Sequence, residues 1–167
     1  MIKIGKNISR FSAYSCQPKT NEELKEIIKE RIKQYGPECD LNDIDVSLIE
    51  DMSSLFYKSR FNGDISKWDV SHVKNMAHLF NKSEFNGDIS NWDVSNVEDM
   101  CGMFYMSKFN QDLSRWDVSN VNDMSYMFEL SDFDNDISKW NMSSVKDTEF
   151  MFYKCSIREK FIPKITR

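Results

Sequence analysis

The sequence has few of the groups on which enzymes rely. Only two histidines are present, His72 and His78, and because they lie six residues apart they do not share one face of a helix. No G-x-S-x-G nucleophile motif, P-loop or Rossmann glycine motif accompanies them. We therefore expect surface histidines, no cofactor and no enzymatic activity. A hydrolase or a calcium-binding protein is the remaining alternative.

Signals for membranes, export and metal sites are also missing. No run of about 18 apolar residues occurs, and residues 1–12 lack the apolar segment and cleavage site of a signal peptide. The sequence thus predicts no membrane insertion and a cytoplasmic location, with export or a cell-surface location as the alternative. The cysteines share no metal-ligand or disulfide spacing, so we expect free thiols and no metal: Cys16, Cys39, Cys101 and Cys155.

The net charge of −5 is unevenly distributed along the chain. Residues 85–108 contain four acidic residues and one basic residue, and residues 109–132 contain five and one, which gives −3 and −4. This acidic middle disfavours a nucleic-acid partner, which requires clustered Lys and Arg to displace counterions. It favours another protein with a basic surface.

What the sequence does contain is a strict repeat of 24 residues. Tryptophan recurs at this interval, at Trp68, Trp92, Trp116 and Trp140. Phenylalanine recurs at the same interval in two columns, one from Phe56 to Phe152 and one from Phe61 to Phe133. A fixed period of this length indicates a stack of coils, each of which needs neighbours to bury its apolar residues. We expect the tryptophans to form a column inside the stack.

The spacing of apolar residues within one coil predicts its secondary structure. The pattern I-x-x-W-x-V-x-x-V of residues 65–73 matches the skeleton of a leucine-rich repeat. We therefore predict an α/β solenoid with a parallel β-sheet on one side, where Trp68 and Val70 point inward. Met76 and Phe80 follow at helical spacing, which predicts short helical turns on the other side.

The segments before and after the repeat are predicted to close its ends. Residues 1–40 form an N-terminal cap with short strands before Cys16 and a helix at about residues 21–35, which starts at the capping box Thr20-x-x-Glu23. Its apolar stripe comprises Leu24, Ile27, Ile28, Ile32 and Tyr35. Residues 41–156 form the solenoid of one partial and four complete coils. Residues 157–167 form a C-terminal cap, in which proline and basic residues protect an edge strand over residues 161–165.

The repeated motif also resembles a known one. F-N-x-D-[IL]-S-x-W-D-V-S-x-V-x-x-M-x-x-[LM]-F, in the coils that start at Phe61, Phe85 and Phe109, is similar to the repeat of the BspA-like leucine-rich-repeat surface-protein family. The resemblance covers about residues 41–152 and implies a solenoid with a parallel sheet on one side. Surface-exposed members are associated with adhesion to host proteins and other cells. A bacterial surface adhesin or virulence-associated binding protein is therefore the alternative function.

Aspartates recur at the same period, and two roles are open for them. One column contains Asp64, Asp88, Asp112 and Asp136, and a second contains Asp51, Asp99, Asp123 and Asp147 with Asn75. Such side chains accept hydrogen bonds from backbone N–H groups at turns. Stacked carboxylates would also offer oxygen ligands to calcium. The G-G-x-G-x-D signature of calcium β-rolls is absent, which favours backbone capping.

Positions that vary between otherwise strict repeats are free for function. In the later coils, aromatic and other apolar residues replace polar ones after the Met column, and they form the predicted protein-binding patch: Tyr105, Met106, Tyr126, Leu130, Phe150 and Tyr153. Such a group is typical of a protein contact, and the alternative is that these rings fold over the loop layer. A second candidate is the polar strand face, which also suits a solvated salt-bridge ladder: Lys67, Asp69, Asp93, Arg115, Asp117 and Lys139. We expect a non-catalytic protein–protein interaction module that is a monomer or a weak homo-oligomer.

Overall fold

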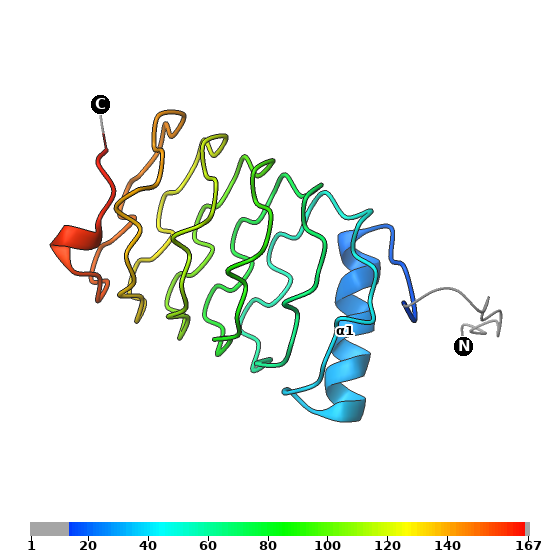
Figure 1. The fold of residues 1–167 in the computed structure, drawn as a ribbon. Coiled ribbons are helices and arrows are strands. Elements are labelled where there is room, and N and C mark those ends of the chain that lie inside the picture. The colour runs from blue at the N-terminus through cyan, green and yellow to red at the C-terminus, as the bar shows by residue number, and fades with distance from the viewer. Residues whose placement is uncertain (1–13, 166–167) are drawn as a thin grey trace.

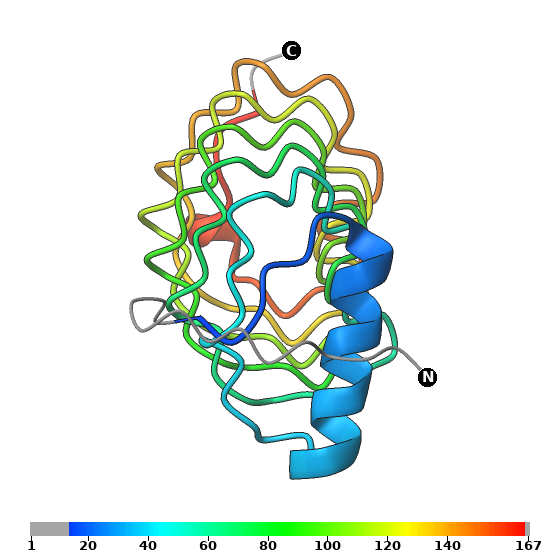
Figure 2. The same cartoon turned by 90° about the vertical axis from the view of Figure 1, so that its right-hand side faces the viewer.

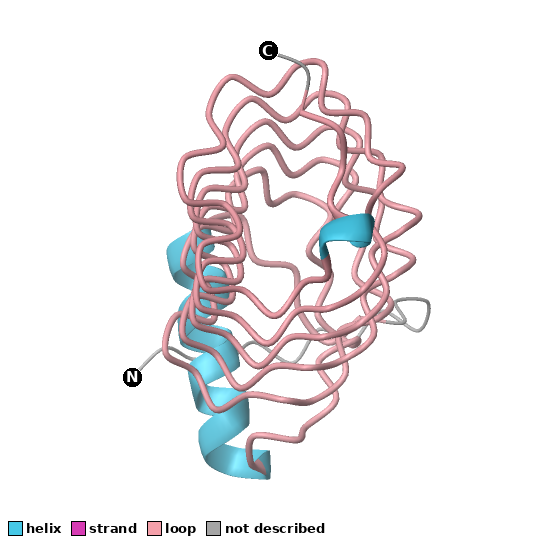
Figure 3. Cartoon of the chain, turned by 90° about the vertical axis from the view of Figure 1, so that its left-hand side faces the viewer, coloured by secondary structure: helices cyan, strands magenta, loops and turns pink. Residues whose placement is uncertain are grey.

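A computed structural model describes residues 14–165 of the chain. The chain winds into a stack of coils with a period of 24 residues, and the first and last coils lie at opposite ends (Figure 1). Viewed along the stack, the coils superpose as rounded rings (Figure 2). Within these residues the structure contains helix α1, Asn21–Tyr35, and the 3₁₀ helix η1, Glu159–Phe161, and it contains no β-strand (Figure 3).

Helix α1 covers the first coil and has the bounds that its sequence predicts. Thr20 is its N-cap, and the Thr20 hydroxyl accepts a hydrogen bond of 3.2 Å from the Glu23 N–H. The Glu23 carboxylate accepts from the N–H of the residue before Thr20, one position further out than in a standard capping box. Leu24 and Ile28 are buried in the core, whereas Tyr35 is 60% exposed and lies outside the buried stripe.

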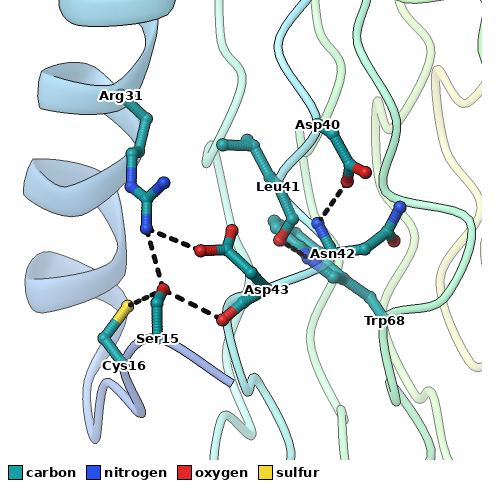
Figure 4. A network of polar contacts seen from close by, with 8 residues as sticks. All are labelled: Ser15, Cys16, Arg31, Asp40, Leu41, Asn42, Asp43 and Trp68. Atoms are coloured by element: carbon teal, nitrogen blue, oxygen red, sulfur yellow. Dashed lines mark hydrogen bonds and ion pairs between the residues drawn. The ribbon is translucent and has the colours of Figure 1, made fainter. Parts of the chain in front are cut away.

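A polar network fastens α1 to the first coil (Figure 4). The Arg31 guanidinium donates to the Asp43 carboxylate and to the Ser15 hydroxyl, each at 2.8 Å. The Ser15 N–H donates to the Asp43 carbonyl at 2.6 Å, and Cys16 forms a single parallel bridge with Ile44. The predicted strands before Cys16 lie almost entirely outside the described residues. The cap therefore holds the first coil by polar contacts as well as by the apolar face of the helix.

Columns of aromatic side chains, one ring from each coil, fill the interior. The four tryptophans are 4–5% exposed, and the rings of Trp68 and Trp92 stack with their centroids 6.4 Å apart. Rings of the Phe56 column stack at 5.4–5.9 Å and rings of the Phe61 column at 6.0–6.5 Å. Each indole N–H donates to a carbonyl of the preceding coil at 2.9–3.1 Å. The interior tryptophan column predicted from the period is confirmed, and its buried polar atoms are paired.

One side of every coil is a series of tight turns, which we call the turn wall. It comprises residues 52–58 and the segments equivalent to them at later 24-residue intervals, the last being residues 148–154. In residues 76–83, alternate N–H groups donate to the carbonyl three residues earlier, and the N–H groups between them donate to carbonyls of the next coil. Sixteen bonds of the second kind, each 2.7–2.9 Å long, join the five turn walls. The turn wall replaces the predicted helical turns because half of its N–H groups bond to the neighbouring coil.

The tryptophan side of the coil has no sheet, because turns interrupt it and side chains link the coils there. Asp64 and Asp69 each accept from the N–H of the serine two residues later, and the chain turns over residues 65–68 and again over residues 70–73. Links to the preceding coil come from the indole N–H groups and from side-chain amides such as that of Asn96. Hydrogen bonds from side chains thus join adjacent coils on this side, as backbone hydrogen bonds join adjacent strands in a sheet.

The predicted α/β solenoid with a parallel sheet is therefore wrong. In residues 14–165, parallel pairing is limited to single bridges, which join Asp51 to Asn75 and so on along that column to Asp147, besides the one at Cys16. A leucine-rich-repeat skeleton specifies which residues point inward, and closely spaced turns meet that requirement as well as strands do. The aspartate-centred turns decide between the two, because they leave no run of extended residues long enough to pair.

At the C-terminal end, η1 and the tail replace the edge strand predicted over residues 161–165. The Phe161 carbonyl accepts from the Ile137 N–H at 3.2 Å, and Pro163 is buried. Arg158 and Lys160 lie over the Phe161 ring, 4.2 and 5.0 Å from its centroid. The tail therefore packs against the last coils as a turn.

Candidate protein-contact surface

Two columns of the turn wall adopt a left-handed backbone conformation. They are Ser54, His78, Gly102, Tyr126 and Phe150, and Lys58, Lys82, Met106, Leu130 and Lys154, with φ between +51° and +59°. Glycine adopts this conformation without strain, whereas the left-handed α conformation costs other residues roughly 1–2 kcal/mol each. The turns and the coil-to-coil bonds impose this left-handed conformation. Glycine is therefore the residue that fits these ten positions with the least strain.

In the later coils, these left-handed positions carry large apolar side chains that remain in contact with water. Met106 is 45% exposed, Leu130 is 38% exposed and Phe150 is 48% exposed, while Tyr126 is half-buried. Neither the backbone preference nor burial in the core accounts for residues of this kind here. Exposed apolar groups at strained positions make this surface a candidate for a protein contact.

Three aromatic rings of the predicted patch lie together on this surface. Tyr126 and Phe150 stack with their ring centroids 5.6 Å apart, and Tyr153 meets Phe150 edge-on, also at 5.6 Å. Tyr153 is 47% exposed, and the Lys154 ammonium lies 5.2 Å from its ring centroid. The rings therefore pack against one another and still expose apolar area to the solvent.

Acidic groups border this ring cluster. The Tyr126 hydroxyl donates to the Glu149 carboxylate at 3.2 Å. Partial desolvation and then this hydrogen bond raise the pKa of Tyr126, and the charges of Glu129 and Asp147 act in the same direction. The surface thus combines an apolar centre with a negative border.

Tyr105, also predicted for the patch, belongs to a neighbouring polar hollow. Its ring centroid lies 5.6 Å from the Lys82 ammonium. A shallow hollow of about 350 Å³ is lined by these two residues together with Ser54, Tyr57, His78 and Asn81. Variation between repeats did not reveal this hollow, because its members are mostly the common polar residues of their columns.

Gly102 explains the placement of His78 in that hollow. A Cβ atom at Gly102 would lie 2.5 Å from His78 Nδ1, so the missing side chain leaves space for the imidazole ring. His78 Nδ1 in turn lies 3.0 Å from Asn81 Nδ2. A single glycine in a column of larger residues was the sequence signal both for this close approach and for the left-handed backbone of the column.

The alternative polar face is exposed but is not a salt-bridge ladder. All six of its predicted residues are exposed: Lys67, Asp69, Asp93, Arg115, Asp117 and Lys139. None of the ion pairs within residues 14–165 includes any of them. Its aspartates instead accept from the serine two residues later, which lowers the pKa of Asp69 and Asp117. The predicted ladder is wrong because each carboxylate is satisfied within its own turn.

The aspartate columns serve the turns as well. Asp64, Asp88, Asp112 and Asp136 each accept from the N–H two residues later at 2.8–2.9 Å, so the capping role is confirmed. No three His, Cys, Asp or Glu side chains within the described residues form a group that could hold a metal ion. The four cysteines are free thiols, as predicted. Neither helix in this part of the chain has the length and apolar character needed to cross a membrane.

Comparison with known proteins identifies the family of this chain. The family model described as "Mycoplasma protein of unknown function, DUF285" matches residues 23–129 and 83–164. No curated protein and no solved structure matches the chain. The match corrects the predicted membership of the BspA-like leucine-rich-repeat surface-protein family, whose strands are missing from residues 14–165. Because the two matched segments together span most of the sequence, the chain belongs to the family of Mycoplasma proteins of unknown function, DUF285.

Proposed function

We propose that this protein is a non-catalytic protein-interaction module that binds its partner through the turn wall of its later coils. The binding surface, which we call the contact patch, comprises Met106, Tyr126, Leu130, Phe150 and Tyr153, with Tyr105 at its border. The observation that supports this proposal is the presence of large, exposed apolar side chains at left-handed backbone positions.

The side chains of the contact patch would contribute more stabilisation in a complex than in the free chain. In the free chain, each of the four left-handed members of the patch carries a backbone strain of roughly 1–2 kcal/mol. Complete burial of one such side chain contributes roughly 1.5–3 kcal/mol, and about half of that stabilisation is unused while the side chain is half exposed. Contact with a partner would bury the exposed half, so the residues stabilise a complex more than they stabilise the isolated fold.

The charges around the patch define the partner further. Glu129, Asp147 and Glu149 surround Tyr126, and residues 85–132 carry a net charge of −3 − 4 = −7. A fitting partner surface has an apolar centre and a basic border. Such complementarity mainly accelerates association, and salt weakens it because the charged groups are exposed.

Affinity capture from a lysate of the organism that makes the protein tests this proposal. The test variant carries Met106→Gly, Leu130→Gly and Phe150→Gly, since glycine suits the left-handed backbone at all three positions. We expect it to fold, with an unchanged circular-dichroism spectrum, and to lose the proteins that the unmodified chain captures. The matched control carries Ser54→Gly and Lys58→Gly, in the same two columns at the other end of the stack, and should capture normally.

Two results would contradict the proposal. The triple variant could retain the same captured protein at full yield, which would remove the contact patch from the interface. Alternatively, the control could lose the protein equally, which would show that these columns matter only for the fold. A third variant, Lys67→Ser with Lys139→Ser, tests the polar face as the competing surface.

A further inference from the structure

The last turn wall has no following coil, so the backbone N–H groups that would donate to one have no such acceptor. In the four earlier turn walls, N–H groups at alternate positions donate to carbonyls of the next coil at 2.7–2.9 Å. Thr148, Phe150, Phe152 and Lys154 occupy the equivalent positions in the last wall. No acceptor among residues 14–165 receives the N–H groups of these four residues. This edge, which we call the donor edge, therefore displays a row of backbone donors spaced two residues apart.

Helix α1 lies across the opposite end of the stack (Figure 1). The turn wall at that end presents carbonyl groups, and the Asn21 side-chain amide of α1 donates to the carbonyls of Asp51 and Ser53 at 3.0 and 3.1 Å. Asn21 is only 8% exposed. Helix α1 thus supplies donors to two of the four carbonyls of this acceptor edge, whereas no carbonyl of the described tail accepts from the donor edge, although Ile165 lies beside it.

We propose that the donor edge binds an extended polypeptide segment of another protein, which supplies carbonyl groups at alternate residues. A second copy of this chain does not fit, because its own donor edge also offers N–H groups and its acceptor edge lies beneath α1. A polypeptide that adds to an exposed backbone edge gains main-chain hydrogen bonds and places alternate side chains in neighbouring hollows. A hollow of about 580 Å³ beside the edge, lined by residues 145–150 and Ile165, is available for such side chains.

The donor edge consists of backbone N–H groups, whereas the contact patch consists of side chains, and Phe150 is the one residue that belongs to both. A synthetic peptide, NDMSYMFELS, serves as the probe. It copies residues 122–131, whose carbonyls receive the N–H groups of residues 100–106 inside the stack. The peptide therefore offers acceptors in the register that the internal coils use.

Amide hydrogen exchange measured by NMR on the full chain tests the proposal. In the free protein, the amides of Thr148, Phe150, Phe152 and Lys154 should exchange rapidly, while the equivalent amides of residues 124–130 exchange slowly. Addition of the peptide should slow exchange at the four edge amides. Thr148→Pro removes one donor and should weaken peptide binding by about fivefold or more, whereas Thr148→Ala keeps the N–H and should bind as the unmodified chain does. Both variants are compared by melting temperature to confirm folding.

Three outcomes would overturn the proposal. Edge amides that are already protected in the free chain would show that the chain's own terminal residues occupy the edge. Equal peptide binding by Thr148→Pro and Thr148→Ala would place the peptide elsewhere. The absence of protection at millimolar peptide would show that the edge does not bind it. A variant with Met106→Gly and Leu130→Gly alone changes the contact patch outside the donor edge and should still bind the peptide, so the failure of one proposal is distinguishable from the failure of the other.

Discussion

Substitutions at Met106 test the left-handed backbone on which the proposed function depends. Both Met106→Ala and Met106→Gly remove the exposed side chain, but only alanine keeps a Cβ atom in the left-handed conformation, with φ of +51°. That Cβ costs roughly 1–2 kcal/mol in the folded chain. The glycine variant loses roughly 0.4–1 kcal/mol of stability, because glycine gives the unfolded chain more conformational freedom than alanine does. The glycine variant should therefore be more stable than the alanine variant by about 0.5–1 kcal/mol, which reverses the usual order.

Urea unfolding followed by circular dichroism measures this difference. For a chain of this size, 1 kcal/mol corresponds to a shift of about 2–4 °C in melting temperature, so thermal melts provide a second measurement. Glu84 supplies the control, because it is exposed and is not among the residues with positive φ. Alanine should be the more stable substitution at Glu84. If alanine is also the more stable substitution at Met106, the left-handed backbone and the strain argument are both wrong.

Other predictions concern the core, the hollow and the turns. Trp116→Phe leaves the buried Ile89 carbonyl without its 3.1 Å hydrogen bond and should lower the free energy of unfolding by roughly 1–3 kcal/mol, measured by urea denaturation. Gly102→Ala places a Cβ against His78 at a φ of +57° and should lower the melting temperature by several degrees; an unchanged value would contradict the close approach. The Ser90 N–H lowers the pKa of Asp88 in the folded chain below its ordinary value of 3.8, so the associated stability is present above pH 3.8 and is lost as the pH falls through the lowered pKa. The urea midpoint should therefore decrease as the pH falls below about 4, and Asp88→Asn should reduce that dependence.

The repeat period predicted the stack and its interior because equivalent buried positions require the same type of residue in every coil. Trp68 and its equivalents recur at one interval, since each ring fills the same space and its indole N–H meets a carbonyl of the coil before. The N-terminal helix was predictable for a similar reason, because its start signal at Thr20 is local. Both features depend on short-range or strictly repeated interactions that one sequence displays.

The sheet could not be predicted correctly, because inward-pointing residues alone do not distinguish strands from closely spaced turns. The deciding signal was the aspartate two residues before a serine, as at Asp69, which favours a turn over an extended run. The residues of the proposed contact patch were predicted from their variation between repeats, but the left-handed backbone at several of them was not. Gly102 was the single residue whose type indicates a left-handed backbone. The other four residues of its column are not glycine, so the column as a whole did not indicate that conformation.

Site-specific photo-crosslinking in living cells can show whether the turn wall of the later coils contacts another protein. A benzophenone amino acid at Leu130, in the contact patch, is compared with the same group at Asp93, on the polar face. We expect one discrete crosslinked protein from position 130 that is absent from position 93. A crosslink from position 93 alone, or no crosslinked protein from position 130, would contradict it.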